Sequence, residues 1–182
     1  GVPTFRGEGG IWRSYRAQDL ATPNAFGRDP KLVWEFYDWR RGLLKPLNPN
    51  LGHQALVQLE KRSPEFILVT QNIDGLHQLA GNSRVIELHG NIWHVRCTGC
   101  GKVSENKEVP IPILPYCKGC GGLLRPHVVW FGENLEEDIL ESAVTAIKKC
   151  DLLMVIGTSG VVQPAASFAG MAKEAGAKVI EI

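Results

Sequence analysis

Hydrophobic side chains recur at helical spacing over residues 30–45, in a helix that begins near Pro30. One stripe of this helix holds five side chains spaced i, i+3, i+4, i+7 and i+11: Val33, Phe36, Tyr37, Arg40 and Leu44. Arg40 is the exception in this stripe, because burying a charge without a partner is costly. From the pattern alone, we expect Arg40 to extend past the edge of the core or to pair with an acid, and Asp38 to pair with Arg41 on the surface.

The rest of the chain alternates predicted helices with short apolar strands. The segments in chain order are a helix at 51–62, a strand at 66–70, a short helix closed by Gly81, a strand at 84–88, a helix at 136–150, a strand at 151–157, a helix at 164–176 and a strand from 177 onward. Residues 1–29 show no clear period and are expected to form a loop with at most short helical pieces. The alternation predicts an α/β fold with a Rossmann-like, mostly parallel sheet and helices on both faces.

Composition adds bounds to this picture. The chain has 182 residues, of which 44% are hydrophobic and 21% charged, and its formal net charge is +1. This size suits one ordinary domain, or one domain with a small insert. A nearly neutral chain has no global field that would recruit nucleic acid or an anionic membrane, and no apolar run approaches the length of a membrane span. We therefore expect no nucleic-acid partner and no membrane partner.

Two C-x-x-C pairs predict a metal site within residues 91–124, a segment whose prolines and cysteines mark it as a small inserted zinc-binding module. The pairs are separated by sixteen residues and consist of Cys97, Cys100, Cys117 and Cys120. Four thiolates close a tetrahedron around Zn²⁺ without an open position, so the spacing favours a structural zinc over disulfides, a redox pair or a zinc hydrolase. The segment lacks the dense basic and aromatic mixture of a nucleic-acid-binding zinc ribbon. The Rossmann-like core is then residues 1–90 and 125–182.

The odd number of cysteines, five in all, argues against a secreted disulfide framework. We expect a reducing compartment, the cytoplasm first and the mitochondrion as an alternative. The fifth cysteine, Cys150, precedes a predicted strand and is expected to be a buried core thiol.

Polar and small residues follow three of the predicted strands. They occupy 70–74 (Thr-Gln-Asn-Ile-Asp), 89–90 (His-Gly) and 157–159 (Gly-Thr-Ser). In an open α/β sheet, ligands bind outside the carboxyl ends of the strands. These groups together suit a sugar-phosphate ligand, with one imidazole that can move protons near neutral pH.

Each of these residues also has a structural interpretation. Asp74 could cap the helix that follows it, His89 could be a satisfied loop histidine, and 157–159 could be an ordinary strand-to-helix turn. Their coincidence at three strand ends favours function. The other histidines lack such a placement and are interpreted as structural or surface residues: His53, His77, His94 and His127.

Several long motifs resemble those of the sirtuins, which are NAD-dependent protein-lysine deacylases. The motifs follow the family order from Gly1 to Ile182 and read "GVPTFR", "TQNIDGLHQLAG", "ELHG", the two C-x-x-C pairs, "RPHVVWFGE" and "GTS". "YDWR" resembles the Tyr-x-x-Arg pair of class III sirtuins, which prefer succinyl, malonyl and glutaryl lysine. The helix at 30–45 would then belong to a small lobe that holds the acyl group.

The resemblance implies roles for individual residues. Phe5 and Arg6 would lie near the nicotinamide ribose, and the nicotinamide and ribose pocket would be lined by Gln71, Asn72, Ile73 and Asp74. His89 would be the general base, with Asn72 beside it as a catalytic residue, and the adenosine side of NAD would contact Gly157, Thr158 and Ser159. The substrate peptide would add as a strand along Val129, Trp130, Phe131, Gly132 and Glu133.

The resemblance also implies a reaction. The acyl oxygen of the substrate displaces nicotinamide from NAD, His89 activates a ribose hydroxyl, and the products are free lysine and O-acyl-ADP-ribose. Tyr37 and Arg40 would hold the carboxylate of an acidic acyl group, because a guanidinium and a hydroxyl both donate to it and an acetyl group offers no such anion.

The family pattern extends beyond this chain on both sides, with a glycine-rich strand and loop before "GVPTFR" and further chain after "VIEI". The chain is therefore expected to be a sirtuin core cut at both ends, acting as a monomer on an acylated protein or peptide. Two alternatives remain: deacetylation or mono-ADP-ribosyl transfer on the same scaffold, and a non-catalytic module stabilised by zinc.

Overall fold

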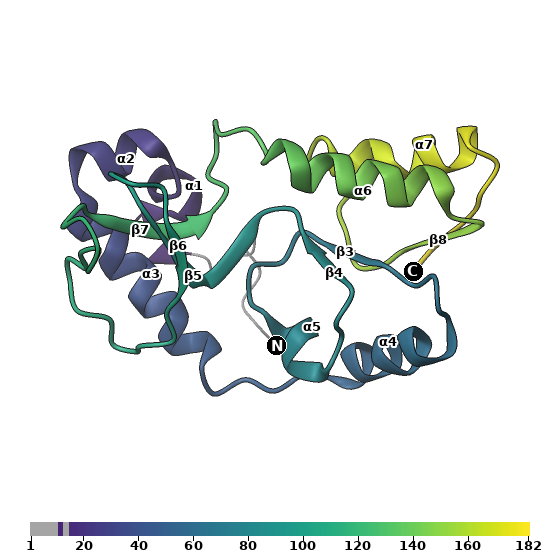
Figure 1. Cartoon of the computed structure of the whole chain (residues 1–182), viewed down its shortest axis with the longest axis horizontal. Helices are drawn as coiled ribbons and strands as arrows, with labels where there is room; N and C mark the ends of the chain where they lie inside the picture. Colours follow the sequence, from purple (N-terminus) through teal and green to yellow (C-terminus); the bar gives the residue numbers. More distant parts are fainter. Residues whose placement is uncertain (1–10, 13–14) are drawn as a thin grey trace.

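The protein, described over residues 11–12 and 15–182 by a computed structural model, has two lobes built on different kinds of sheet (Figure 1). The antiparallel lobe consists of α1 (Ala17–Leu20), α2 (Pro23–Arg28), α3 (Pro30–Leu44), β5 (Gly90–Cys97), β6 (Val103–Glu105) and β7 (Leu124–Val128). The parallel lobe consists of α4 (Leu51–Arg62), β3 (Leu68–Thr70), α5 (Leu76–Ala80), β4 (Val85–Glu87), α6 (Glu137–Lys149), β8 (Leu152–Val155), the 3-10 turn η1 (Ala165–Ser167), α7 (Phe168–Glu174) and β9 (Lys178–Glu181). A two-residue pair, β1 (Ile11–Trp12) with β2 (Tyr15–Arg16), precedes α1.

The helices α3 and α4 both begin directly after a side chain that caps them. The Asp29 carboxylate accepts from Leu32 N at 2.9 Å, and Pro30 occupies the first turn of α3, where no amide donor is needed. At the start of α4, Asn50 and His53 bond each other's backbone amides in a capping box. His53 therefore has the structural role that the sequence indicated.

The expected parallel strands are present, as two separate hydrogen-bonded pairs within the described residues. β3 pairs with β4, and β8 pairs with β9, both in parallel register. Figure 1 shows α6 and α7 on one side of these strands and α4 and α5 on the other, in agreement with the α/β prediction. α7 begins at Phe168, after a 3-10 turn, which is later than the position of Pro164 suggested.

Each lobe has its own hydrophobic core. The core of the antiparallel lobe is rich in aromatic side chains and includes Phe26, Trp34, Phe36, Tyr37, Ile92, Val95 and Trp130. The core of the parallel lobe is aliphatic apart from one phenylalanine and consists of Leu88, Ala143, Ile147, Phe168, Ala172 and Ala177. Cys150 is half-buried against this second core, where its thiol contacts Ile147 O at 3.1 Å.

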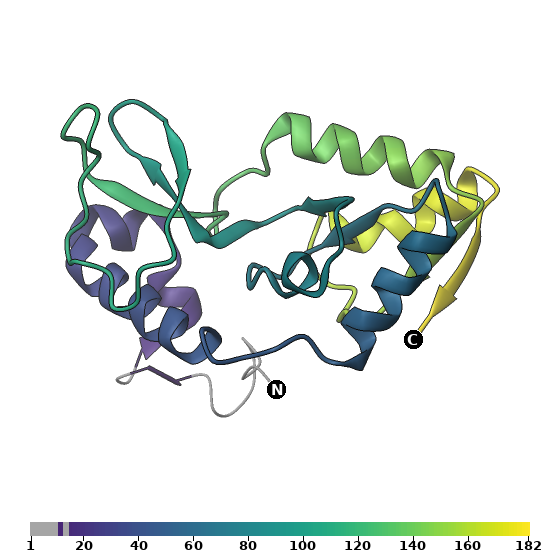
Figure 2. The same ribbon diagram turned by 60° about the horizontal axis from the view of Figure 1, so that its bottom comes forward.

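β5 carries the chain from the parallel lobe into the antiparallel lobe, and the segment after β7 carries it back to α6 (Figure 2). Arg96 of β5 pairs with Glu136, directly before α6, so an ion pair joins the two lobes. None of the helices in the described part of the chain has the length and apolar content of a membrane span.

Candidate active site and zinc centre

The three polar strand ends lie together. His89, after β4, has its Nδ1 3.0 Å from the carbonyl oxygen of Gln71, which follows β3. The Gln71 side chain in turn donates from Nε2 to Thr158 Oγ1, after β8, at 3.3 Å. Because parallel strands present their carboxyl ends on one edge, the polarity of the strands produces this convergence.

His89 has the geometry of a base. A carbonyl oxygen only accepts, so the Nδ1 facing it carries the proton and Nε2 is the unprotonated nitrogen. Burial lowers the pKa of His89, and the bond to the Gln71 carbonyl opposes this shift only in part. The imidazole is therefore neutral at neutral pH, as a general base must be.

The loop after β3 is pinned to β5. Asn72 N donates to Thr70 Oγ1 at 3.1 Å, and Ile73 O accepts from Ile92 N at 2.8 Å. Asp74 stands directly before Gly75, the N-cap residue of α5, and its Oδ1 accepts from the first helical amide, Leu76 N, at 2.9 Å, so its carboxylate stabilises the start of α5. That bond occupies one of the two carboxylate oxygens.

Residues 157–159 form a tight exposed turn. Gly157 has a φ of 61°, in the left-handed region that favours glycine, and its N–H donates to Ile182 O at 3.0 Å. Thr158 Oγ1 accepts from Gly160 N at 3.3 Å, so this hydroxyl closes the turn as well as meeting Gln71. Phe5 and Arg6, the other residues expected at the cofactor, lie outside the described residues.

The segment predicted to bind substrate is tied to His89. Val129 N donates to His89 O, and Phe131 N donates to Ala21 O, both at 2.9 Å. Trp130 N donates to Glu133 Oε2 at 2.9 Å. Glu133 N donates to Trp130 O at 3.0 Å, so four of the amide donors along 129–133 are used within the protein.

The side chains of Tyr37 and Arg40 have different environments. Tyr37 is buried, its hydroxyl accepts from Trp130 Nε1 at 2.8 Å, and burial raises the pKa of Tyr37 to about 12. Arg40 is half-buried, and its guanidinium carbon lies 5.9 Å from the centroid of the Phe36 ring. Burial lowers the pKa of Arg40, against the opposing effects of Tyr37 and Asp74. The Arg40 guanidinium is therefore attracted by the carboxylate of Asp74, in the loop after β3.

The expected surface pair between Asp38 and Arg41 is wrong. Arg41 is fully buried, and it donates from Nε to Ile92 O at 2.9 Å and from Nη1 to Asn106 Oδ1 at 2.7 Å. Asp38 instead accepts from the backbone N–H of Ile111 at 2.7 Å. Burial lowers the pKa of Arg41 to about 10. Arg41 lies two turns after Trp34, which is also fully buried, so the buried face of α3 includes positions outside the predicted stripe.

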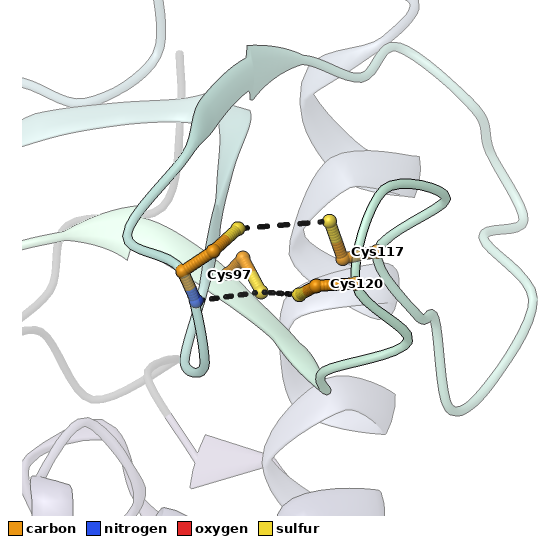
Figure 3. Close-up of side chains that lie close together, drawn as sticks. Cys97, Cys117 and Cys120 are labelled. Carbon is orange, nitrogen blue, oxygen red and sulfur yellow. Dashed lines mark hydrogen bonds between the residues drawn. The ribbon is translucent and has the colours of Figure 1, made fainter.

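The four cysteines form one cluster. Their Sγ atoms all lie within 4.8 Å of one another, and Figure 3 shows Cys97, Cys117 and Cys120 pointing toward one another. The Sγ–Sγ distances are 3.4 Å for Cys97 and Cys120 and 3.9 Å for Cys100 and Cys117. A regular tetrahedron with Zn–S bonds of about 2.3 Å has an S–S edge of about 3.8 Å, so the cluster fits zinc.

Backbone amides support the thiolate form of Cys97. The N–H groups of Cys100 and Gly99 point to Cys97 Sγ at 3.4 Å, and they lower the pKa of Cys97 to about 6. Gly122 N lies 3.4 Å from Cys120 Sγ in the second pair. The residues present therefore suit a structural Zn²⁺ held by four sulfurs, as the spacing predicted.

One residue of the site was missed in the sequence. Arg125 of β7 donates to Glu133 Oε1 from Nη1 at 2.6 Å and to Oε2 from Nη2 at 2.9 Å. Its guanidinium carbon lies 3.5 Å from the centroid of the Trp130 ring. The only available signal was an arginine two positions before a histidine in "RPHVVWFGE", which does not reveal a stacked and bidentate contact.

A cavity of about 440 Å³ lies elsewhere, lined in part by Glu60, Lys61 and Arg84. Arg84 precedes β4, whereas His89 follows it, so this cavity is at the opposite ends of the strands. It does not belong to the cluster of polar strand ends.

Comparisons with known proteins agree with this geometry. Residues 1–164 match the Sir2 family. The whole chain aligns with 77% of the NAD-dependent protein deacylase of Aquifex aeolicus (strain VF5), at 54% sequence identity. It also aligns with 67% of the mitochondrial NAD-dependent protein deacylase sirtuin-5 of Canis lupus familiaris, at 48% identity. The fold is similar to that of a solved Sir2 homolog–NAD complex, with a TM-score of 0.93, 48% identity and coverage of 99% of this chain and 71% of that one.

Proposed function

The chain belongs to the Sir2 family, and we propose that it is an NAD-dependent protein-lysine deacylase that prefers succinyl, malonyl and glutaryl groups. The names of its relatives support the activity, and one of them is a sirtuin-5. The acyl preference is a finer proposal, and it rests on the side chains of Tyr37 and Arg40.

The observation that carries the activity is the placement of His89 beside Gln71 and Thr158 at the strand ends. NAD, when bound, would supply the ribose carbon from which nicotinamide departs and the ribose hydroxyl that reacts after this departure. His89 Nε2 takes a proton from a ribose hydroxyl, because Nδ1 is held as a donor by the Gln71 carbonyl. The imidazole keeps this orientation throughout because the bond is to the backbone.

The other strand-end residues are proposed to hold the cofactor. Asn72 and Asp74 lie on the loop that Ile73 pins to β5, so their side chains are offered from a fixed backbone. Gly157 and Ser159 flank Thr158 in the exposed turn and suit the adenosine side, where a small residue lets a ligand approach the backbone.

The acyl preference follows from charge. A half-buried guanidinium at Arg40 offers a bidentate donor to a carboxylate, and the Tyr37 hydroxyl offers a second donor. An acetyl group lacks the carboxylate and gains nothing from either group. A site that hydrogen-bonds a group of its substrate discriminates more strongly against an analogue that lacks this group than a site that differs only in size.

The zinc centre is proposed to act in folding. Its four sulfurs leave no open coordination position, so the metal has no contact with substrate. Thiolates must remain reduced to hold the metal, which supports a reducing compartment such as the cytoplasm.

The test uses the full-length protein and mass spectrometry of succinyl-lysine and acetyl-lysine peptides, with and without NAD. We expect Arg40→Met to lower kcat/KM on the succinyl peptide by about 10- to 100-fold, the effect of losing a charged hydrogen bond, and to leave the acetyl reaction within about twofold. Lys31→Met removes a charge from the exposed side of the same helix and is the matched control.

Two outcomes contradict the proposal in different ways. An absence of any NAD-dependent product would reject the deacylase activity. Equal losses on both peptides in Arg40→Met would keep the activity and return Arg40 to a structural role, with deacetylation as the remaining function.

A further inference from the structure

The hydrogen bond between Trp130 and Tyr37 has a fixed direction. An indole N–H can only donate, so the Tyr37 oxygen accepts at 2.8 Å and its own proton is left to donate elsewhere. Both side chains are buried, with exposed fractions of 2% for Trp130 and 3% for Tyr37. Because burial raises the pKa of Tyr37 to about 12, the hydroxyl keeps that proton at neutral pH.

The indole is held by contacts to its ring and through its backbone. The Arg125 guanidinium carbon lies 3.5 Å from the Trp130 ring centroid, and the Phe26 ring packs against the indole at 5.3 Å between centroids. Glu133 receives both Arg125 bonds and also accepts from Trp130 N at 2.9 Å. Arg125 and Glu133 thus hold Trp130 so that its indole N–H points in one direction, toward the Tyr37 oxygen.

We propose that Trp130 is a positioning residue for acyl selection, which fixes the Tyr37 hydroxyl as a hydrogen-bond donor toward a substrate carboxylate. A carboxylate only accepts, so it is bound by a hydroxyl whose proton is available and repelled by one whose lone pair faces it. This inference rests on the proposed preference for acidic acyl groups. It assigns the direction of the hydroxyl to a residue that never touches the acyl carboxylate.

The position of Trp130 gives this arrangement a second consequence. Trp130 lies between Val129, which is bonded to the His89 carbonyl, and the turn closed by Glu133. The same segment is proposed to hold the substrate peptide. A change in its path moves the indole and therefore the Tyr37 hydroxyl, so peptide binding and acyl selection share one structural element.

The test is a double-mutant cycle in the full-length protein, with kcat and KM measured on succinyl-lysine and acetyl-lysine peptides of one sequence. Trp130→Phe keeps an aromatic ring for stacking and removes the N–H. We expect it to raise KM for the succinyl peptide by about tenfold relative to KM for the acetyl peptide, as the loss of one buried hydrogen bond predicts, whatever change the two peptides share. In a Tyr37→Phe background the same substitution should change the succinyl-to-acetyl ratio no further.

Trp34→Phe is the matched control. Trp34 Nε1 donates to Leu124 O, also at 2.8 Å and in the same core, so this variant loses an equivalent indole bond away from Tyr37. We expect Trp34→Phe to lower the thermal unfolding temperature without changing the ratio of the two substrates. A purely structural role for Trp130 would make the two variants behave alike.

A spectroscopic measurement covers the case in which Trp130→Phe does not fold. In the wild-type protein, the Trp130 indole N–H signal should shift further with the succinyl peptide than with an acetyl peptide of the same sequence, because a bonded chain of donors polarises along its length. An equal shift with the two peptides would overturn the inference.

The outcomes separate the two proposals. A wild-type enzyme without preference for the succinyl peptide rejects the proposed acyl preference, and the inference with it. The inference alone is rejected if the Trp130→Phe protein keeps the wild-type preference for the succinyl peptide. It is also rejected if adding Trp130→Phe to Tyr37→Phe lowers the succinyl-to-acetyl ratio below that of Tyr37→Phe.

Discussion

The antiparallel lobe and the parallel lobe differ in how they hold polar groups. In the antiparallel lobe, the aromatic core encloses Arg41 and the Tyr37 hydroxyl, each with hydrogen-bond partners. In the parallel lobe, the polar groups of the candidate site stand at strand ends, and Thr158 lies in an exposed turn.

This difference divides the proposed reaction between the lobes. A buried polar group in a well-packed core has one orientation, which suits the selection of one acyl group over another. Strand-end groups on exposed turns suit a large cosubstrate that arrives from solvent. Selection is therefore expected to depend on the stability of the antiparallel lobe, and proton transfer on the strand ends of the parallel lobe.

The largest expected effect concerns the zinc centre. Cys117→Ala should release the metal and unfold the antiparallel lobe, because a structural zinc contributes about 10–16 kcal/mol in small zinc domains. Zinc content and near-ultraviolet circular dichroism, which reports the aromatic core, measure this. Cys150→Ala, a cysteine outside the cluster, should keep the zinc and the aromatic signal. A metal-free Cys117→Ala protein with an intact aromatic signal would show that the antiparallel lobe folds without zinc.

A smaller effect is expected for the buried cation. Arg41→Ala should lower the free energy of unfolding by about 3 kcal/mol, because it removes the Arg41 donors to Ile92 O and Asn106 Oδ1 and leaves the latter only the Glu108 N–H at 3.3 Å. Denaturant unfolding measures the change. Arg62→Ala makes the same substitution on an exposed face of α4 in the parallel lobe, and should change the free energy by about 0.5 kcal/mol or less. Equal losses for the two variants would show that the lobes do not differ in this respect.

The smallest effect is a pH dependence that arises in the parallel lobe. The pKa of His89 is lowered by burial, so its neutral form persists below the usual value of 6.5. As pH falls through the lowered pKa, protonation removes the base and kcat/KM should drop about tenfold per pH unit. A kcat/KM profile on the succinyl peptide, which reports the pKa of the free enzyme, measures this, with circular dichroism at each pH as the control for folding. A profile that falls already above pH 6.5 would contradict the shift.

The sequence predicted the features that depend on local pattern. The helix at 30–45, the strands before Gln71, His89 and Gly157, and the cysteine tetrad follow from spacing and from the polarity of parallel strands. Phe5 and Arg6 remain predictions, since they lie outside the described residues, and so do the domain boundaries and the roles of the site residues.

The sequence did not predict contacts between distant residues. Arg40 and Arg41 differ by one position on a helix, and only the packing of Ile92 and Asn106 against α3 decides which one is fully buried. Trp130 and Tyr37 are 93 residues apart, and no spacing rule connects them. The separation of the parallel strands into two pairs also depends on tertiary packing, because each strand alone has the same apolar pattern.

Gly90 limits how the two lobes can be exchanged between relatives. It follows His89 and begins β5, with a φ of 73°, and a Cβ at this position would lie 2.3 Å from the His127 carbonyl oxygen. Any side chain at position 90 would therefore push β7 away from β5. This would also move His89 relative to Val129, whose N–H donates to the His89 carbonyl. A chimera that joins the lobes of two sirtuins should keep 89–90 and β7 from the same parent, so that the crossover does not fall at this contact.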